Sequence, residues 1–369
     1  MPLLKHKRTH ATSLLLLFAA VTMITISGFG ETLMMSSTIS CIVLTLIIWL
    51  SARNSCAMSF LGYIMACVLC FCIGSIFLNS TLSEDRPYKI TNFVSTFLII
   101  GIVKLLSKYD WAGQLSLRSG AALCGASIAV ITMLWPGMFL HGWNPNSSIF
   151  VIPIIITGLS IVYRSGTQIS LILFYTLIIL GILCIWKLEN RSSVLTLALF
   201  SLFPLLSKWL DRKLSIRTLC TICIASCTLT PFFQSSLAKL NIFNEVVGLS
   251  GISKGERLFN GREDLWDHII NQIKLNPLFG SGGLRDVYTH NLALDILVQY
   301  GWVGWLSFVI MVVYLIETSY ARNKNCIFIY GFLLLFILNT YENAFVGNGF
   351  FTFFPYILIG IALNIKKAS

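Results

Sequence analysis

Long apolar stretches separated by short polar ones dominate this chain. A helix that spans a membrane needs about 20 consecutive, mostly apolar residues. Windows of that length predict about twelve such helices, near residues 11–30, 33–51, 56–79, 91–107, 117–136, 148–163, 168–186, 193–209, 214–233, 290–317, 325–341 and 349–365. The pattern predicts an all-α polytopic membrane protein in which residues 1–369 form a single integral membrane domain.

The longest polar interruption covers residues 234–289 and is the one segment with the character of a soluble domain. Within it, residues 262–275 place apolar side chains at intervals of one, three and four residues, which is the spacing of one helix face. The members of that face are Leu265, Trp266, Ile269, Ile270 and Ile273. Pro277 and the following glycines should end this helix, which we expect on the membrane surface or over a cavity.

Composition excludes most other classes of protein. The chain is 56% hydrophobic and only 11% charged, whereas a typical soluble domain carries about 25% charged residues. A chain with so few charged residues cannot cover the surface of a globular protein of this size. Most of its surface must therefore face lipid. The net charge of +11 does not indicate nucleic-acid binding, because the basic residues are scattered in short loops and form no stripe.

The basic residues instead predict how the chain is oriented. They occur at the N-terminus and then in every second loop: Lys5, Lys7, Arg8, Arg53, Lys104, Lys108, Arg118, Arg164, Lys208, Arg212, Lys213, Arg217, Arg322, Lys324, Lys366 and Lys367. Cytoplasmic loops of membrane proteins are enriched in Lys and Arg. We therefore expect both termini in the cytoplasm and residues 234–289 on the outer, periplasmic side.

Eleven cysteines are present, and nearly all lie inside apolar runs. Cys220, Cys223 and Cys227 have a spacing that resembles a metal site, but they lie in the middle of a predicted helix without a nearby histidine. Packing of small, polarizable side chains between helices is the better interpretation. We predict no metal site and no cofactor.

Three residues on the predicted outer side are candidates for chemistry: Arg191, Arg262 and His290. Each also has an ordinary structural interpretation. Arg191 could extend along the membrane interface, Arg262 could be a solvated charge at a helix start, and His290 could be a structural residue at a membrane boundary. The three become more informative when they are considered together.

His290 and Asn291 are followed, after nine residues, by Gly301-Trp302-Val303-Gly304. This pattern resembles the His-Asn, nine-residue gap, Gly-x-x-Gly motif of the O-antigen ligase family. Three further runs resemble the same family: Asn144-Pro145-Asn146, Asn260-Gly261-Arg262-x-x-Leu265-Trp266 and Asn276-Pro277-Leu278-Phe279-Gly280-x-Gly282. The likeness covers residues 140–310 and includes Arg191-Ser192. Asn190 departs from it, because the family more often has Ser before the arginine that corresponds to Arg191.

The resemblance implies a GT-C-like glycosyltransferase in the bacterial inner membrane, with its active site facing the periplasm. Its donor would be a glycan on undecaprenyl pyrophosphate. A ligase moves that glycan to a hydroxyl of the lipid A core in lipopolysaccharide biosynthesis, whereas an O-antigen or capsule polymerase moves it to a second undecaprenyl-linked glycan. The ligase is the preferred of these two expectations.

The same resemblance suggests roles for individual residues. Arg191 and Arg262 would bind the pyrophosphate, since a guanidinium holds phosphate oxygens with two hydrogen bonds and can replace a metal. His290 would be the general base, because the charge of a histidine changes near neutral pH. Further predicted residues are Arg257 and Arg285 for the phosphates, Asn291 and Trp266 for the sugar, and Gly301 and Gly304 for close helix packing.

A transporter of the same lipid-linked glycan is the rival class, since twelve spans suit a flippase as well. Transporters usually carry their charges and interrupted helices near the middle of the membrane. In this chain the charges cluster outside the apolar runs, and the deepest carboxylate, Asp295, is alone. The sequence pattern therefore favours an enzyme.

Overall fold

The computed structural model describes residues 116–141, 151–187, 190–238, 262–280, 289–323, 326–340 and 353–364. The predicted helices before residue 108 lie outside these ranges. Every regular element within them is an α-helix: α5 (Leu117–His141), α6 (Ile152–Arg164), α7 (Gln168–Trp186), α8 (Arg191–Ser201), α9 (Phe203–Leu210), α10 (Lys213–Ala238), α12 (Arg262–Leu275), α13 (Leu292–Asn323), α14 (Cys326–Leu338) and α15 (Phe353–Asn364).

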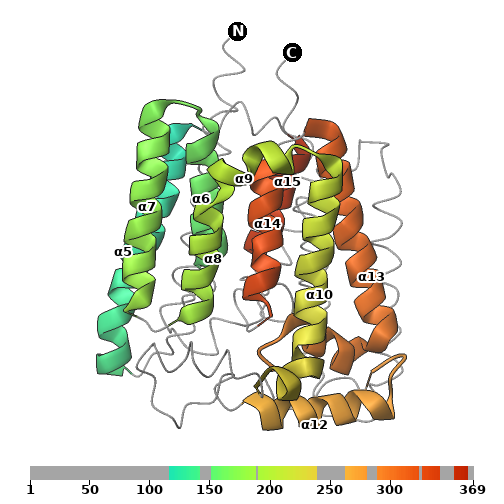
Figure 1. The fold of residues 1–369 in the computed structure, drawn as a ribbon. Helices are drawn as coiled ribbons and strands as arrows, with labels where there is room; N and C mark the ends of the chain where they lie inside the picture. The colour runs from blue at the N-terminus through green and yellow to red at the C-terminus, as the bar shows by residue number, and fades with distance from the viewer. Residues whose placement is uncertain are drawn as a thin grey trace, which may run out of the picture.

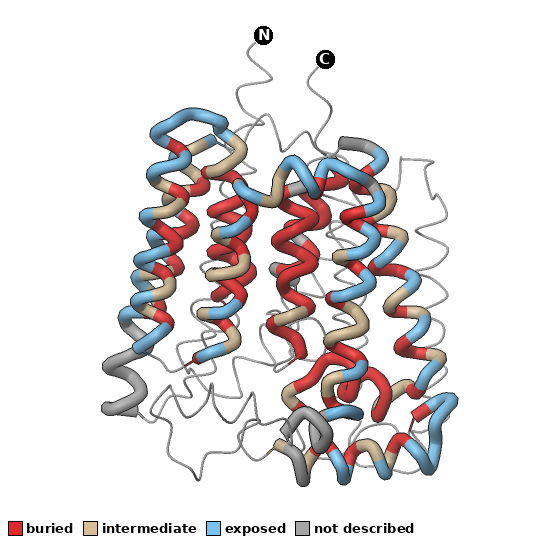
Figure 2. Tube along the Cα trace, in the orientation of Figure 1, coloured by how far each residue is buried: buried red, intermediate tan, exposed pale blue. Residues whose placement is uncertain are grey.

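Most of these helices run side by side, and two short ones lie across their ends (Figure 1). The amphipathic helix α12 crosses one end, which we call the α12 end. The short helix α9 lies at the opposite end, which we call the α9 end. The central helix α14 packs against α6, α8, α10 and α15, and nearly all of its described side chains are buried (Figure 2).

Each predicted span after residue 116 coincides with a helix or a pair of helices. Residues 168–186, 214–233 and 292–321 form helices long and apolar enough to cross a membrane, and the bent pair α8 and α9 is a fourth candidate. Large apolar side chains also point outward along α7, including Ile169, Ile172 and Leu183. The described residues therefore confirm the all-helical part of the prediction, and their apolar helices suit a lipid environment.

The segment 193–209, predicted as a single helix, consists of two helices in the structure. The helix α8 ends at Ser201, α9 begins at Phe203, and the two axes are bent by 61°. Pro204 lies in the first turn of α9, where its missing N–H costs nothing, but it cannot continue the hydrogen-bond ladder of α8. The apolar content of the segment concealed this break.

The helix predicted at residues 262–275 is confirmed, with the same bounds, as α12. Trp266, Ile269 and Ile273 are buried, whereas Asp267 and His268 are exposed on the opposite face (Figure 2). The buried face packs against α10 and α13. The amphipathic pattern is thus satisfied by the protein's own helices.

The turn after α12 is locked onto a break within α13. Gly301, at this break, has a φ of 65°, and a Cβ built there would lie 2.2 Å from the main-chain oxygen of Leu278. The main-chain N–H groups of Trp302 and Val303 donate to the carbonyl oxygens of Pro277 (2.8 Å) and Leu278 (3.2 Å). Gly301 therefore provides close packing, as predicted for it, but its partner is this turn and not another helix.

Candidate functional site

His290 has an unusual backbone conformation. Its φ of 56° is the one positive φ at a non-glycine residue within the described ranges. The left-handed region costs an L-residue roughly 1–2 kcal/mol, and residues held there cluster at functional sites. We call residues 289–291, which lead into α13, the strap.

Thr289 fixes the strap on one side of His290. It is buried, and its hydroxyl lies 2.5 Å from Oδ1 of Asp295 and 2.8 Å from the carbonyl oxygen of Asn291. The same hydroxyl accepts a hydrogen bond from the N–H of Asn291 (3.1 Å). The indole N–H of Trp266 donates to the carbonyl oxygen of Thr289 (2.7 Å), which ties the strap to α12.

Asn291 fixes the strap on the other side. Its side chain is completely buried, and its amide nitrogen donates to the carbonyl oxygens of Cys227 on α10 (3.1 Å) and Thr340 after α14 (2.9 Å). Its side-chain oxygen accepts from the N–H of Leu294 (2.9 Å) and so caps the start of α13. Asn291 thereby connects three helices, and its amide is fully used inside the protein.

His290 is consequently a half-buried residue between two buried, hydrogen-bonded neighbours. The fixed strap leaves the imidazole as the one partly accessible side chain of the three residues. Asn291 and Trp266 were predicted to contact sugar, but both side chains are completely buried and bonded within the protein. We therefore assign them structural roles in holding the strap.

The start of α8 is a second polar site at the α12 end. Arg191 is the first residue of this helix and is exposed, and no acidic residue lies in the first turn. Asn190 caps the helix, because its Oδ1 accepts from the N–H of Ser193 (3.0 Å) and from the hydroxyl of Ser192 (2.9 Å). Yet Nδ2 of Asn190 and Oγ of Ser193, both buried, have no hydrogen-bond partner in the described structure.

Arg262 is the first residue of α12 and is half-buried. Arg191 and Arg262 are the first residues of α8 and α12, and His290 lies just before the start of α13. These three helices begin at the α12 end, at the bottom of Figure 1. The three predicted residues therefore lie at the same end of the bundle. The helix α14 packs against both α8 and α10. Arg257 and Arg285 lie outside the described residues, and Gly304 is buried in α13.

The cysteines of α10 behave as packing residues. Cys220, Cys223 and Cys227 are buried and free, and the sulfur of Cys227 lies 3.5 Å from the carbonyl oxygen of Asn339. Across the ranges that the structure describes, no three His, Cys, Asp or Glu side chains gather as a metal site would require. The burial of all three cysteines agrees with the packing interpretation.

A pocket of about 480 Å³ lies at the opposite, α9 end. It is lined by the turn between α6 and α7, by α9 and by the start of α14, and its polar residues include Arg164, Gln168 and Asp211. None of the predicted site residues lines it. The geometry around His290, and not this pocket, defines the candidate site.

Comparison with known proteins adds no assignment: no family model, no curated protein and no solved structure matches this chain. The class that its described residues establish is a helical protein with apolar helices suited to a membrane. Its membership of the O-antigen ligase family remains a prediction from the motifs.

Sequence reasoning missed Thr289 and the contact that it makes with Asp295. In the sequence, Asp295 is a lone carboxylate within an apolar run. The structure begins α13 only at Leu292, so the strap folds back and brings Thr289 to Asp295. The sequence does contain a signal for this contact, because Thr289 is a further polar residue directly before the apolar run of α13.

Proposed function

We propose that this protein is an integral-membrane glycosyltransferase that moves a glycan from undecaprenyl pyrophosphate to an acceptor hydroxyl. An O-antigen ligase acting on the lipid A core is the preferred form. The observation that carries the proposal is the strap: a histidine in a strained conformation, fixed on both sides by buried hydrogen bonds, at the end of the bundle that also holds Arg191 and Arg262.

The start of α8 supports the binding of an anionic leaving group. A helix N-terminus carries a partial positive charge and free N–H groups, and it is therefore a favourable place for phosphate. Arg191 adds a full positive charge there, and the partnerless Nδ2 of Asn190 and hydroxyl of Ser193 add buried donors. Buried polar groups without partners are rare in proteins, and a missing ligand is one physical reason for them.

The reaction follows from these groups. The acceptor hydroxyl attacks the anomeric carbon of the donor, and His290 takes up the proton of that hydroxyl. A new glycosidic C–O bond forms while the C–O bond to the pyrophosphate breaks, and undecaprenyl pyrophosphate leaves. Arg191 and Arg262 stabilise the charge on the departing group, and loss of one such preorganised donor typically lowers a rate by about 10²–10³.

The proposal also includes an orientation, with the α12 end in the periplasm and both termini in the cytoplasm of a bacterial inner membrane. Arg118, Arg164, Lys208, Arg212 and Arg217 gather toward the α9 end, which supports a cytoplasmic α9 end. Alkaline phosphatase fused after Ser250 should be active, and phosphatase fused after Lys213 should be inactive. The reverse result would overturn the orientation and the catalytic proposal with it.

Deletion of the gene, followed by gel analysis of lipopolysaccharide, tests the activity. A ligase mutant should lose all polymer from the lipid A core and keep polymer on undecaprenyl pyrophosphate. A core that carries one repeat unit would instead identify a polymerase. Single units that remain on the cytoplasmic face would identify a flippase and contradict the proposed enzyme.

A further inference from the structure

Thr289 is hydrogen-bonded through both its hydroxyl and its carbonyl oxygen, although it is not part of the motif that drew attention to His290. Its hydroxyl lies within hydrogen-bond distance of Asp295 Oδ1 and the Asn291 carbonyl, and it accepts from the Asn291 N–H. Its carbonyl oxygen accepts from Trp266. Thr289 and its acceptor Asp295 are both buried, at 1% and 6% exposure, so water does not compete for these bonds.

These contacts surround the one residue of the strap whose backbone is strained. A left-handed histidine persists only where its surroundings hold it more firmly than its own preference for other conformations. The bond from the hydroxyl to Asp295 fixes the chain before His290 onto the first turn of α13. The bond from Trp266 fixes the same residue onto α12, the helix that begins with Arg262.

We infer that Thr289 is a positioning residue: through its hydroxyl to Asp295 and its carbonyl to Trp266 it holds the His290 imidazole in place relative to Arg262. The inference rests on the proposed function for its catalytic consequence. Its structural part, a fixed imidazole, is independent of that function. Displacement of a catalytic group by about 1 Å lowers a rate by about 10²-fold, so one lost hydroxyl is expected to matter.

The matched pair Thr289→Val and Thr289→Ser tests the hydroxyl. Valine keeps the shape and the main-chain bond from Trp266 but removes the hydrogen bonds of the hydroxyl, whereas serine keeps the hydroxyl and removes a methyl group. With a polyprenyl-pyrophosphate-linked glycan as donor, Thr289→Val should lower kcat at least tenfold and leave the KM for the donor within twofold. Thr289→Ser should keep kcat within threefold of the wild type.

Labelling with diethyl pyrocarbonate tests the position of the imidazole without any assay of activity. Peptide mass spectrometry of the full-length protein in membranes gives the rate at each histidine. His290 should react at least three times faster in Thr289→Val than in the wild type, because a loosened strap exposes it. His268, which is exposed on α12, is the internal control and should react at the same rate in both.

The outcomes separate the two ideas. An active His290→Ala variant would remove the proposed base, and the labelling experiment would still decide whether Thr289 fixes the strap. An inactive His290→Ala variant with a fully active Thr289→Val variant, or equal losses in the valine and serine variants, would overturn the inference alone. If Thr289→Val does not accumulate, Trp266→Phe removes the indole donor and should give the same changes at smaller size; unchanged labelling there would also overturn it.

Discussion

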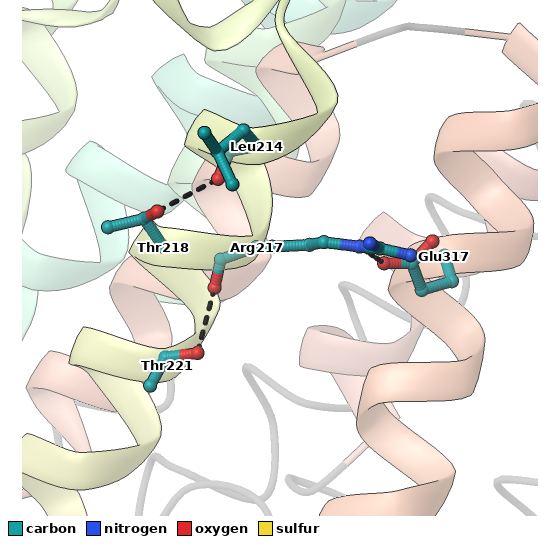
Figure 3. A network of polar contacts seen from close by, with 5 residues as sticks. All are labelled: Leu214, Arg217, Thr218, Thr221 and Glu317. Atoms are coloured by element: carbon teal, nitrogen blue, oxygen red, sulfur yellow. Dashed lines mark hydrogen bonds and ion pairs between the residues drawn. The ribbon is translucent and has the colours of Figure 1, made fainter.

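The helices α10 and α13 are joined by one polar contact near each end of α13, and the two contacts differ in kind. At the α9 end, Nε of Arg217 lies 2.5 Å from Glu317, and the two side chains are 58% and 29% exposed (Figure 3). The hydroxyl of Tyr320 also donates to the carbonyl oxygen of Asp211 nearby. At the α12 end, the neutral amide of Asn291 bonds to Cys227 with no exposure at all.

The difference shows which end of the pair requires exact geometry. An exposed ion pair is weak, because its partners exchange contacts with water and ions at little cost. A buried amide has no such replacement, so its loss leaves two carbonyl oxygens and a helix start unsatisfied. The contact at the α9 end therefore only joins the two helices. The contact at the α12 end joins them and also fixes the position of His290.

Replacement of His290 by glycine should have the largest effect and separate activity from stability. Transfer should fall by about 10²–10⁴ because the base is lost. Thermal stability in detergent should change little, because glycine adopts a positive φ without strain and this relief offsets the lost contacts of the side chain. His268→Ala, on the exposed face of α12, should behave like the wild type. More than a tenth of normal turnover in His290→Gly would exclude the general-base role.

Gly301→Ala should damage the α12 end through its main chain. The new methyl group would meet the carbonyl of Leu278 in a backbone conformation that alanine resists, at a cost of about 3 kcal/mol. Thermal unfolding should show the loss. Gly125→Ala is the control, because a Cβ there has no atom within 4 Å, and alanine favours a helix by about 1 kcal/mol. Equal stability of the two variants would contradict the tight contact at Gly301.

Asn190→Ser separates the helix cap at the start of α8 from the proposed binding role of the Asn190 amide nitrogen. Serine caps a helix about as well as asparagine but lacks the amide nitrogen. The KM for the donor should rise about tenfold, the equivalent of one hydrogen bond to a charged group, with kcat nearly unchanged. Asn190→Ala should lower stability as well, because the cap is lost. An unchanged KM in Asn190→Ser would show that Nδ2 does not contact the donor.

Arg217→Gln should have the smallest effect, because the pair with Glu317 is exposed. Tyr320 also connects α13 to the turn before α10, and Asn291 connects α13 to α10 itself. Transfer and the yield of folded protein should remain within twofold of the wild type. Glu317→Gln is the matching variant and should give the same result. A severe loss in either would mean that the α9 end fixes the site as firmly as the α12 end.

Much of the fold follows from the sequence because apolar length and spacing report the environment of a helix directly. The spans after residue 116 and the face of α12 were predicted in this way. The bend at Leu202 was not predicted. A hydropathy window reports the apolar run across this point but not the start of a new helix that Pro204 marks. The helix ends also differ between prediction and structure: α10 continues to Ala238, beyond the predicted end at residue 233.

The sequence supplies the candidate residues of the site, whereas their contacts come only from the structure. Motif spacing selected His290, Arg191 and Arg262, whose positions at one end of the bundle agree with the predicted topology. The left-handed backbone of His290 and the bond between Thr289 and Asp295 depend on where α13 begins, which periodicity does not define. The bridge from Asn291 to Cys227 and Thr340 joins residues far apart in sequence, and no local pattern contains it.

That bridge sets an order for the making of the protein. Cys227 is synthesised before Asn291, but Thr340 follows it by 49 residues, and Leu292 likewise donates to the carbonyl oxygen of Asn339. Residues up to Thr340, including all of α14, must therefore be synthesised before the strap can form all of its hydrogen bonds, although His290 is synthesised much earlier. Contacts of this long range form late. A nascent chain that stops short of residue 340 should contain every predicted catalytic side chain and still lack the active geometry.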